Sequence, residues 1–593
     1  MLEKSIYELF KNVCDKNRDK IAFRYKAGAD WKPVTWGEHQ ETCQKISKSL
    51  IALGIEKDDK VNILSNTRME WIQVDMATVS IGATIVGIYA SNLADDCAYV
   101  INHSDAVILF IENQEQLDKI SQVRKDLPKL RHIIIIDGES PGAEGLITWQ
   151  EFIAKGINIT DDKFLARANE ILPGDIASLV YTSGTTGTPK GAMITHENLV
   201  FTSWSAVQSL LIKPHYETLL FLPLAHVFAR IIVYVCLREG ITLNIGEGIE
   251  KTGDNLKEIK PHFIGSAPRL YEKAYVKITS NAQDSGGIKY KIFKWALGVG
   301  SAVSKLQQQK KTIPGFLASK HKLANKLVFS KIQMALGGNI VYAVSGAAPL
   351  NKAIAEFFHA CGVLILEGIG MTENTSFSNL NRYDNYKFGT VGPLGPEIEQ
   401  KIMQDGEVLF RGKNNMLGYY KSPEETADII DQDGWLHSGD IGDVDEDGFL
   451  RITDRKKDLI ITSGGKNIAP QRVEKLMQTS RYIGQAVVYG EKKKYLTGLV
   501  TLDKDQVEEW ATKHGIQFNN WEELCKNQRV IDLINNEVQE KNKYLSSYET
   551  LKKALILPNE FSVESGELTA SFKIKRKVVT ENYRTRLDSL YED

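Results

Sequence analysis

The chain has 593 residues, of which 42% are hydrophobic and 25% charged, so it is long enough for at least two domains and too apolar to be disordered throughout. A formal net charge of −2 provides no overall positive field, and we therefore expect no nucleic-acid partner. The six cysteines form no CxxC pair, which argues against a zinc site or disulfide framework and favours a reducing compartment, the cytoplasm.

Short apolar runs rich in β-branched residues alternate with helical patterns in the first part of the chain. Residues 61–64, 107–111 and 132–136 are predicted strands, and residues 69–82 form a predicted helix between the first two. This alternation is typical of an α/β fold with a largely parallel sheet.

The most apolar window covers residues 225–237 and contains His226 and Arg230. It is 13 residues long, whereas a membrane-spanning helix needs about 20 apolar residues. The window therefore predicts a buried helix. Peripheral contact with a membrane remains open.

A loop rich in glycine and threonine follows a predicted strand at residues 175–181. Residues 182–191 read TSGTTGTPKG; its glycines permit a tight turn that brings N–H groups to an anion, and its hydroxyls can donate to phosphate oxygens. The loop is not a Walker A motif, because Pro189 precedes Lys190 and Gly191 follows it. The candidate phosphate-binding residues are Thr182, Ser183, Gly184, Thr185, Thr186, Gly187 and Lys190.

This ten-residue string resembles the signature loop of the acyl-adenylate-forming superfamily, which includes acyl-CoA synthetases, luciferases and the adenylation domains of peptide synthetases. The resemblance implies ATP as a cofactor. It also implies a large N-terminal domain of Rossmann-like α/β subdomains with a small β-rich unit, followed by a smaller, mobile α+β C-terminal domain.

Two further segments resemble the substrate-binding parts of that family. Residues 221–226 (FLPLAH) end on His226, which by this match lines the acyl site. Residues 345–349 (SGAAP) are similar to the turn that packs on adenine, where small residues let a flat base lie against backbone. The adenine-turn residues are Gly346, Ala347 and Ala348.

Residues 367–373 (EGIGMTE) resemble the family's GYGxTE segment. The match implies that Thr372 contacts the α-phosphate and that Glu373 helps to hold Mg²⁺, an ion that prefers hard oxygen ligands, with Thr185 as a second candidate ligand. Ile369 departs from the pattern, because it stands where the family usually has an aromatic residue stacked on adenine. The nucleotide-binding residues of this segment are Gly368, Ile369 and Gly370.

The segments that follow imply the ribose site and a hinge. Residues 433–440 (DGWLHSGD) resemble the family's GWLxTGD segment, whose last residue, here Asp440, grips the ribose hydroxyls. In residues 454–458 (DRKKD), Arg455 matches a second ribose contact and Lys457 the hinge position. Residues 406–448 predict a compact β-rich unit. We expect an N-terminal AMP-binding and acyl-binding domain at residues 1–456 and a mobile catalytic domain at residues 457–593.

Two C-terminal segments complete the resemblance. Residues 463–467 (SGGKN) match a glycine-rich loop, here Gly464 and Gly465, that gives the pantetheine arm of coenzyme A a narrow passage. Residues 568–576 (LTASFKIKR) resemble the segment with the catalytic lysine, and the spacing to Arg576 selects Lys573 over its competitor Lys575. Phe572 departs from the pattern, because the family often has glycine at that position. The implied catalytic residues are Lys573, Thr372, Glu373 and His226.

Two features of the sequence indicate which acid the enzyme would activate. No Asp near His226 could pair with an amino group, and residues 265–273 (GSAPRLYEK) resemble long-chain acyl-CoA synthetases. We expect a medium- to long-chain fatty acid and coenzyme A as substrates of a cytoplasmic enzyme, with membrane association and oligomer formation left open. The alternatives are a fatty acyl-AMP ligase that serves a carrier protein, a ligase for another acid, a luciferase-like oxygenase, or a non-catalytic nucleotide sensor.

Overall fold

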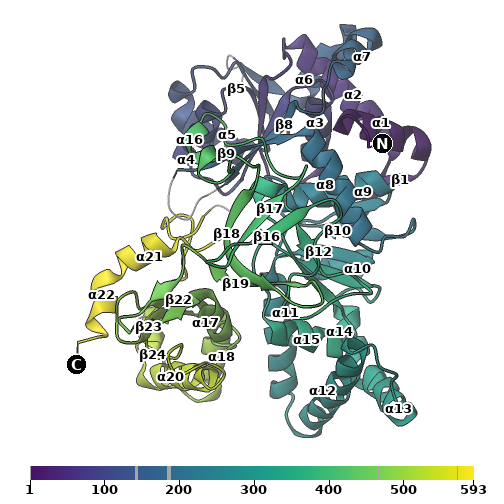
Figure 1. The fold of residues 1–593 in the computed structure, drawn as a ribbon. Coiled ribbons are helices and arrows are strands. Elements are labelled where there is room, and N and C mark those ends of the chain that lie inside the picture. The colour runs from purple at the N-terminus through teal and green to yellow at the C-terminus, as the bar shows by residue number, and fades with distance from the viewer. Residues whose placement is uncertain (1, 140–144, 183–187, 465, 570–571, 593) are drawn as a thin grey trace.

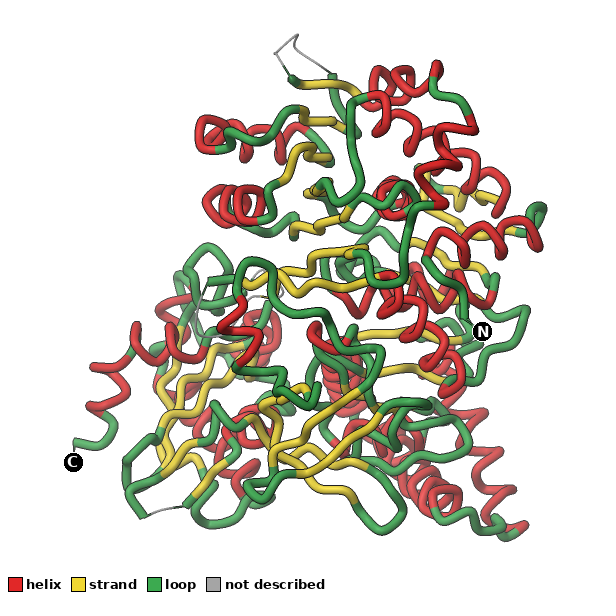
Figure 2. The backbone as a smooth tube through the Cα atoms, turned by 45° about the horizontal axis from the view of Figure 1, so that its top comes forward, coloured by secondary structure: helices red, strands yellow, loops and turns green. Residues whose placement is uncertain are grey.

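The computed structural model describes residues 2–139, 145–182, 188–464, 466–569 and 572–592. The described residues form two large sheets covered by helices, a four-stranded antiparallel unit, and a C-terminal part at the lower left of Figure 1. Figure 2 shows the strands gathered in these separate layers, with helices between and around them.

The first sheet has the order β7-β6-β5-β3-β4-β8-β9, and all its neighbouring strands are parallel except β8 and β9. Its strands are β3 (Lys60–Leu64), β4 (Thr84–Ile88), β5 (Ala106–Ile111), β6 (His132–Ile135), β7 (Leu146–Thr148), β8 (Ile176–Thr182) and β9 (Lys190–Thr195). The helices of this region are α1 (Ile6–Asn17), α2 (Trp36–Ala52), α3 (Met69–Val79), α4 (Ala94–His103), α5 (Gln114–Val123), α6 (Trp149–Lys155) and α7 (Asp161–Asn169). The predicted strands at 61–64, 107–111 and 132–136 are confirmed. The predicted helix at 69–82 ends three residues early, because Gly82 adopts a left-handed conformation with φ +74°.

The second sheet has the order β15-β14-β13-β12-β10-β11-β1-β2, in which the inner pairs are parallel and the two outer pairs antiparallel. Its strands are β1 (Ile21–Ala27), β2 (Asp30–Thr35), β10 (Glu217–Leu220), β11 (Thr242–Ile245), β12 (Phe263–Ser266), β13 (Tyr342–Ser345), β14 (Ile365–Ile369) and β15 (Asn379–Leu380). The helices of this region are α8 (His196–Ser209), α9 (Val227–Glu239), α10 (Thr252–Ile259), α11 (Pro268–Asp284), α12 (Gly287–Gln308), α13 (Gly315–Ala324), α14 (Ser330–Ala335) and α15 (Lys352–Ala360). The predicted α/β class is therefore confirmed.

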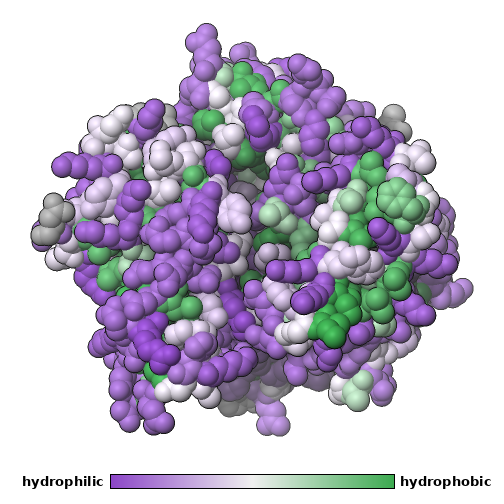
Figure 3. Space-filling view, turned by 90° about the horizontal axis from the view of Figure 1, so that it is seen from below, coloured by the Kyte–Doolittle hydropathy of each residue, from purple (hydrophilic) through white to green (hydrophobic). Residues whose placement is uncertain are grey.

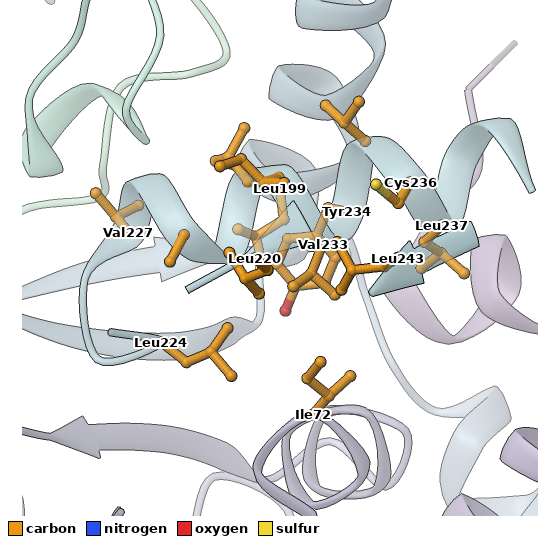
Figure 4. Packing of buried hydrophobic residues seen from close by; sticks show 14 of the residues in the cluster. Ile72, Leu199, Leu220, Leu224, Val227, Val233, Tyr234, Cys236, Leu237 and Leu243 are labelled. Carbon is orange, nitrogen blue, oxygen red and sulfur yellow. The ribbon is translucent and has the colours of Figure 1, made fainter. Parts of the chain in front are cut away.

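The predicted buried helix is α9, which begins where His226 caps it and ends at Gly240, in the left-handed conformation. Figure 4 shows its side chains packed among residues of α8, α3 and the second sheet. No helix in the described part of the chain is both long and apolar enough to cross a membrane.

A buried ion pair fixes α9 against its neighbours. Arg230 lies 2.7 Å from Asp75 of α3, and it also donates to Ser178 of β8. Tyr234 donates to the second carboxylate oxygen of Asp75 at 3.0 Å. Removal of one partner from such a pair leaves an uncompensated buried charge and typically costs about 3–5 kcal/mol. The network therefore holds the helix that carries His226 in a fixed position.

The antiparallel unit has the order β16-β17-β18-β19, and the predicted β-rich unit at residues 406–448 falls within it. Its strands are β16 (Glu399–Ile402), β17 (Glu407–Arg411), β18 (Leu436–Val444) and β19 (Leu450–Arg455), with α16 (Pro423–Ala427) between β17 and β18.

The C-terminal part has its own core, formed around Val473, Val500 and Ile534. Its strands are β20 (Ile460–Ile461), β21 (Asn467–Ile468), β22 (Ile483–Tyr489), β23 (Leu496–Leu502) and β24 (Leu551–Leu557). Its helices are α17 (Pro470–Met477), α18 (Lys504–Lys513), α19 (Trp521–Cys525), α20 (Gln528–Asn542), α21 (Arg576–Asn582) and α22 (Arg584–Ser589). All six cysteines of the chain are buried and free.

Candidate active site

A cavity of about 950 Å³ lies where the two large sheets, the antiparallel unit and the C-terminal part meet. It gathers residues that are far apart in the sequence. The predicted site residues that line it are Thr182, Lys190, His226, Gly346, Ala347, Gly368, Ile369, Gly370, Thr372, Glu373, Arg455, Lys457 and Lys573. Ser183, Gly184, Thr185, Thr186, Gly187 and Gly465 lie outside the described residues.

The β8–β9 hairpin holds the two described ends of the phosphate loop. Thr182 and Lys190 are partners in the antiparallel register, so both stand at the cavity. The Lys190 ammonium lies 2.7 Å from a Glu425 carboxylate oxygen and over the ring of Tyr419. This ion pair is solvent-exposed and therefore weak, so phosphate oxygens can replace Glu425 as its partner. Sequence reasoning missed Glu425, because it is remote in the chain.

Glu373 stands in a tight turn directly after β14. Its carboxylate is buried at the cavity wall, where the Tyr419 hydroxyl donates to Oε1 at 2.6 Å. Thr372 precedes it and also lines the cavity. The turn requires glycine at 370, because a Cβ there would lie 2.1 Å from the backbone carbon of Ser376.

The expected magnesium ion does not need a full set of protein ligands. The described residues contain no group of three or more His, Cys, Asp or Glu that could hold a metal by itself. Mg²⁺ is usually bound by one or two carboxylates together with substrate phosphates, rather than by a full protein cage. Glu373 supplies one such carboxylate beside the candidate phosphate residues.

Asp440 and Arg455 are cross-strand partners on β18 and β19, with the Arg455 Nε 3.1 Å from a carboxylate oxygen of Asp440. Asp440 is buried and Arg455 is half exposed at the cavity. Burial raises the pKa of Asp440, and the guanidinium opposes that rise. The pair presents an acceptor and a donor side by side, as recognition of ribose hydroxyls requires. Asp440 itself does not line the cavity, whereas its neighbours Ser438 and Gly439 do.

His226 and Lys573 both line the cavity, and the charge of Lys573 acts on the His226 ring. The His226 Nδ1 accepts the Phe228 backbone N–H at 3.1 Å, so a neutral ring carries its proton on Nε2. Burial, together with Lys573, lowers the pKa of His226 to about 3, and the ring is therefore neutral at pH 7.

Lys573 faces the open cavity yet is surrounded by protein. Burial and Arg455 lower the pKa of its ammonium, whereas Glu373 and Asp440 oppose that shift. Lys575 does not line the cavity; it stands at the start of α21, where its N–H donates to Glu567.

The backbone at Phe572 explains why the family often has glycine at this position. Its backbone is left-handed, with φ +60°, a conformation in which glycine is unstrained and a bulky side chain is not. The glycine that the family often has at this position fits that backbone geometry.

The side of the cavity that the sequence predicts for adenine differs from expectation at two places. Ala347 lines the cavity and adopts the left-handed region with φ +67°, whereas Ala348 does not reach the lining. Sequence reasoning missed Asn379, which lines the cavity beside Ile369 and whose buried Oδ1 has no hydrogen-bond partner in the described structure. It offers an acceptor where Ile369 offers only apolar contact.

An apolar branch of the cavity runs along one face of α9. The residues of that face recur at helical spacing, and α8 and β12 close the other walls. The lining side chains are Ala206, Leu210, Val227, Phe228, Ile231, Ile232, Val235 and Phe263. Val235 lies nine residues beyond His226, about 13 Å along the helix axis. Trp204 on the neighbouring helix α8 does not line this branch, and Gly464, predicted for the passage of coenzyme A, does not line the cavity.

The pattern of AMP-binding enzymes matches residues 10–420, and that of the AMP-binding enzyme C-terminal domain matches residues 457–593. The chain belongs to the AMP-binding enzyme family. Among curated relatives, this AMP-binding enzyme is 34% identical to long-chain-fatty-acid--CoA ligase FadD15 of Mycobacterium tuberculosis, over 97% of this chain and 94% of the relative. It is 31% identical to human long-chain-fatty-acid--CoA ligase ACSBG2, over 99% and 92%.

Solved structures share the fold of this AMP-binding enzyme. The adenylation domain of a carboxylate reductase from Mycobacterium chelonae superposes with a TM-score of 0.78 at 21% identity, covering 99% of this chain and 91% of that one. The anthranilate CoA ligase AuaEII, in complex with anthranoyl-AMP, superposes with a TM-score of 0.73 at 20% identity, covering 98% of each chain.

Proposed function

We propose that this AMP-binding enzyme is an ATP-dependent ligase that activates a medium- to long-chain fatty acid as its acyl-adenylate and transfers the acyl group to coenzyme A. One observation carries the proposal: a single cavity joins an apolar branch along α9 to a polar end with Lys190, Glu373 and Arg455. The junction between the two holds His226 and Lys573, where a carboxylate and an α-phosphate would meet.

In the first half-reaction, an oxygen of the acid attacks the α-phosphorus, and pyrophosphate leaves with the electrons of the broken P–O bond. Lys573 would bridge the carboxylate and the α-phosphate, and Thr372 would donate to the α-phosphate. The neutral His226 would donate from Nε2 to the carboxylate. Such catalysis rests on positioning and on charge neutralisation.

The other polar residues would hold the nucleotide. Lys190 and the loop from Thr182 through Ser183, Gly184, Thr185, Thr186 and Gly187 would bind the β- and γ-phosphates, and Asp440 with Arg455 the ribose. Glu373, with Thr185, would hold a magnesium ion, which when bound neutralises charge on the phosphate oxygens.

In the second half-reaction, the thiol of coenzyme A attacks the acyl carbonyl and AMP leaves. We place the domain boundary between residues 456 and 457, with Lys457 as the hinge, so that Gly464 and Gly465 replace Lys573 at the cavity after rotation. The present arrangement is held by contacts of α11: Arg481 lies 3.1 Å from Asp284, and Arg269 donates to the Gly484 carbonyl at 3.1 Å. Lys475 also lies 3.4 Å from Glu272, and Lys513 lies 3.8 Å from Asp284, so these contacts are polar, which suits a moving domain.

The apolar branch predicts a chain-length effect. Substitution of Val235 by Trp would fill the far end of the branch and leave the junction at His226 untouched. We expect kcat/KM for hexadecanoate to fall roughly tenfold or more, because overpacking there would exclude a long chain, while kcat/KM for hexanoate stays nearly constant. Pyrophosphate release measured with both acids checks this; an equal fall for both acids would show that the branch does not hold the acyl chain.

The cellular setting follows from the same proposal. Six free, buried cysteines fit a reducing, cytoplasmic environment. We also propose peripheral contact with a membrane, the source of a long-chain acid. A carrier protein remains the alternative acceptor, and comparison of thioester formation on coenzyme A and on a carrier protein separates the two.

A further inference from the structure

A helical extension stands apart from the candidate active site. It consists of α12, α13, a π-helical turn (Asn325–Phe329) and α14. Its inner face packs through a small core that includes Phe293, Ala324 and Phe329. Figure 1 shows α12 and α13 projecting at the lower right, on the far side from the C-terminal end of the chain.

The outer face of this extension carries an apolar stripe. Phe316, Leu323, Leu327 and Met334 are 69%, 49%, 43% and 60% exposed. Phe316 and Leu323 are seven residues apart and lie on one side of α13, Leu327 follows in the π-helical turn, and Met334 stands in α14. Figure 3, seen from below, shows apolar patches among hydrophilic side chains on the side where α12 and α13 lie. When a helix buries one apolar face in the protein and exposes a second apolar face, the exposed face indicates a site of interaction with another molecule.

The charge around this stripe has one sign. The sequence contains no Asp or Glu between Asp284 and Glu356, although the whole chain has 75 acidic and 73 basic residues. The extension and its connecting turn carry exposed lysines, none of which forms an ion pair with another described residue. These lysines are Lys289, Lys291, Lys294, Lys305, Lys310, Lys311, Lys320, Lys322, Lys326 and Lys331.

We propose that this lysine-flanked stripe is the surface by which the enzyme binds an anionic lipid bilayer. The apolar side chains would enter the boundary between headgroups and acyl chains, and the lysines would meet lipid phosphates. A symmetric contact with a second copy would set lysines against lysines. A nucleic acid would pair with the lysines but would leave the Phe316–Met334 stripe exposed. Of these three, only the bilayer satisfies both the charge and the apolar side chains.

This surface would be the membrane contact that the proposed function includes, and in that respect it rests on the proposed function, yet its test needs no catalysis. The full-length protein is sedimented with vesicles of phosphatidylcholine, with and without phosphatidylglycerol. We expect binding only to vesicles with the anionic lipid, weakened by salt. The triple variants F316S/L323S/L327S and K320E/K322E/K326E should each lower vesicle partitioning roughly tenfold or more.

A matched control is K552E/K553E, which changes two exposed lysines of β24 in the C-terminal part and should bind like the wild type. All variants should keep the wild-type melting temperature and the wild-type rate of pyrophosphate release with octanoate. Three results would overturn the inference. The first is equal binding to both vesicle types, and the second is unchanged partitioning of both triple variants. The third is that the substitutions abolish self-association or nucleic-acid binding but not vesicle binding. Intact vesicle binding without ligase activity would contradict only the proposed function.

Discussion

Replacement of Lys573 by alanine should slow acyl-adenylate formation roughly 10²- to 10³-fold, because one preorganised charge at the α-phosphate is removed. Thioester formation from supplied acyl-adenylate should stay close to the wild-type rate, since that step does not use this lysine. Pyrophosphate release reports the first step, and acyl-CoA formation from the adenylate reports the second.

Lys575 provides the matched control, because it is two residues away, carries the same charge and lies outside the cavity lining. Lys575→Ala should change the first half-reaction less than about threefold, as expected for a surface lysine. If the two variants lost both half-reactions equally, or if Lys575→Ala were the more damaged in adenylation, the proposed role of Lys573 would be wrong.

Replacement of Glu373 by glutamine should lower pyrophosphate release roughly 10²-fold and raise the Mg²⁺ concentration needed for half-maximal rate. The amide keeps the shape of the side chain and its contact with Tyr419, but it loses the negative charge that would hold the ion. A magnesium titration of the initial rate measures both effects.

Tyr419→Phe separates charge from positioning at the same place. It removes the 2.6 Å hydrogen bond to Glu373 and leaves the carboxylate charge. We expect a fall of about tenfold at most. A Glu373→Gln enzyme with the wild-type magnesium requirement would show that this carboxylate does not hold the ion.

The sequence predicted which residues line the site better than it predicted which other side chains they contact. Motifs at the ends of β8 and β14 reach one cavity because strand ends of the two sheets face it, and this convergence follows from the α/β pattern. The contacts of Glu373 with Tyr419 and of Lys190 with Glu425 join segments distant in the chain. No local periodicity or turn signal reports such contacts, so only the folded chain reveals them.

Backbone conformation was the second limit of sequence reasoning. The left-handed Phe572 and Ala347 are strained for their residue types. Phenylalanine and alanine give no local sign of that geometry, although the glycine that the family often has at position 572 pointed to it. The early end of α3 at Val79 is the opposite case, because Gly82 is plain in the sequence and its left-handed backbone ends the helix before it. The sequence alone does not predict the exposed stripe on the helices from α13 to α14, because an apolar residue of a helix is more often buried than exposed.

Pyrophosphate release across a panel of acids, with and without coenzyme A, tests the central claim most directly. We predict ATP-dependent release that is greatest with medium- to long-chain fatty acids, together with stoichiometric AMP and acyl-CoA when coenzyme A is present. Release that is independent of the fatty acid, or greatest with an amino acid or a short aromatic acid, would contradict the proposed function.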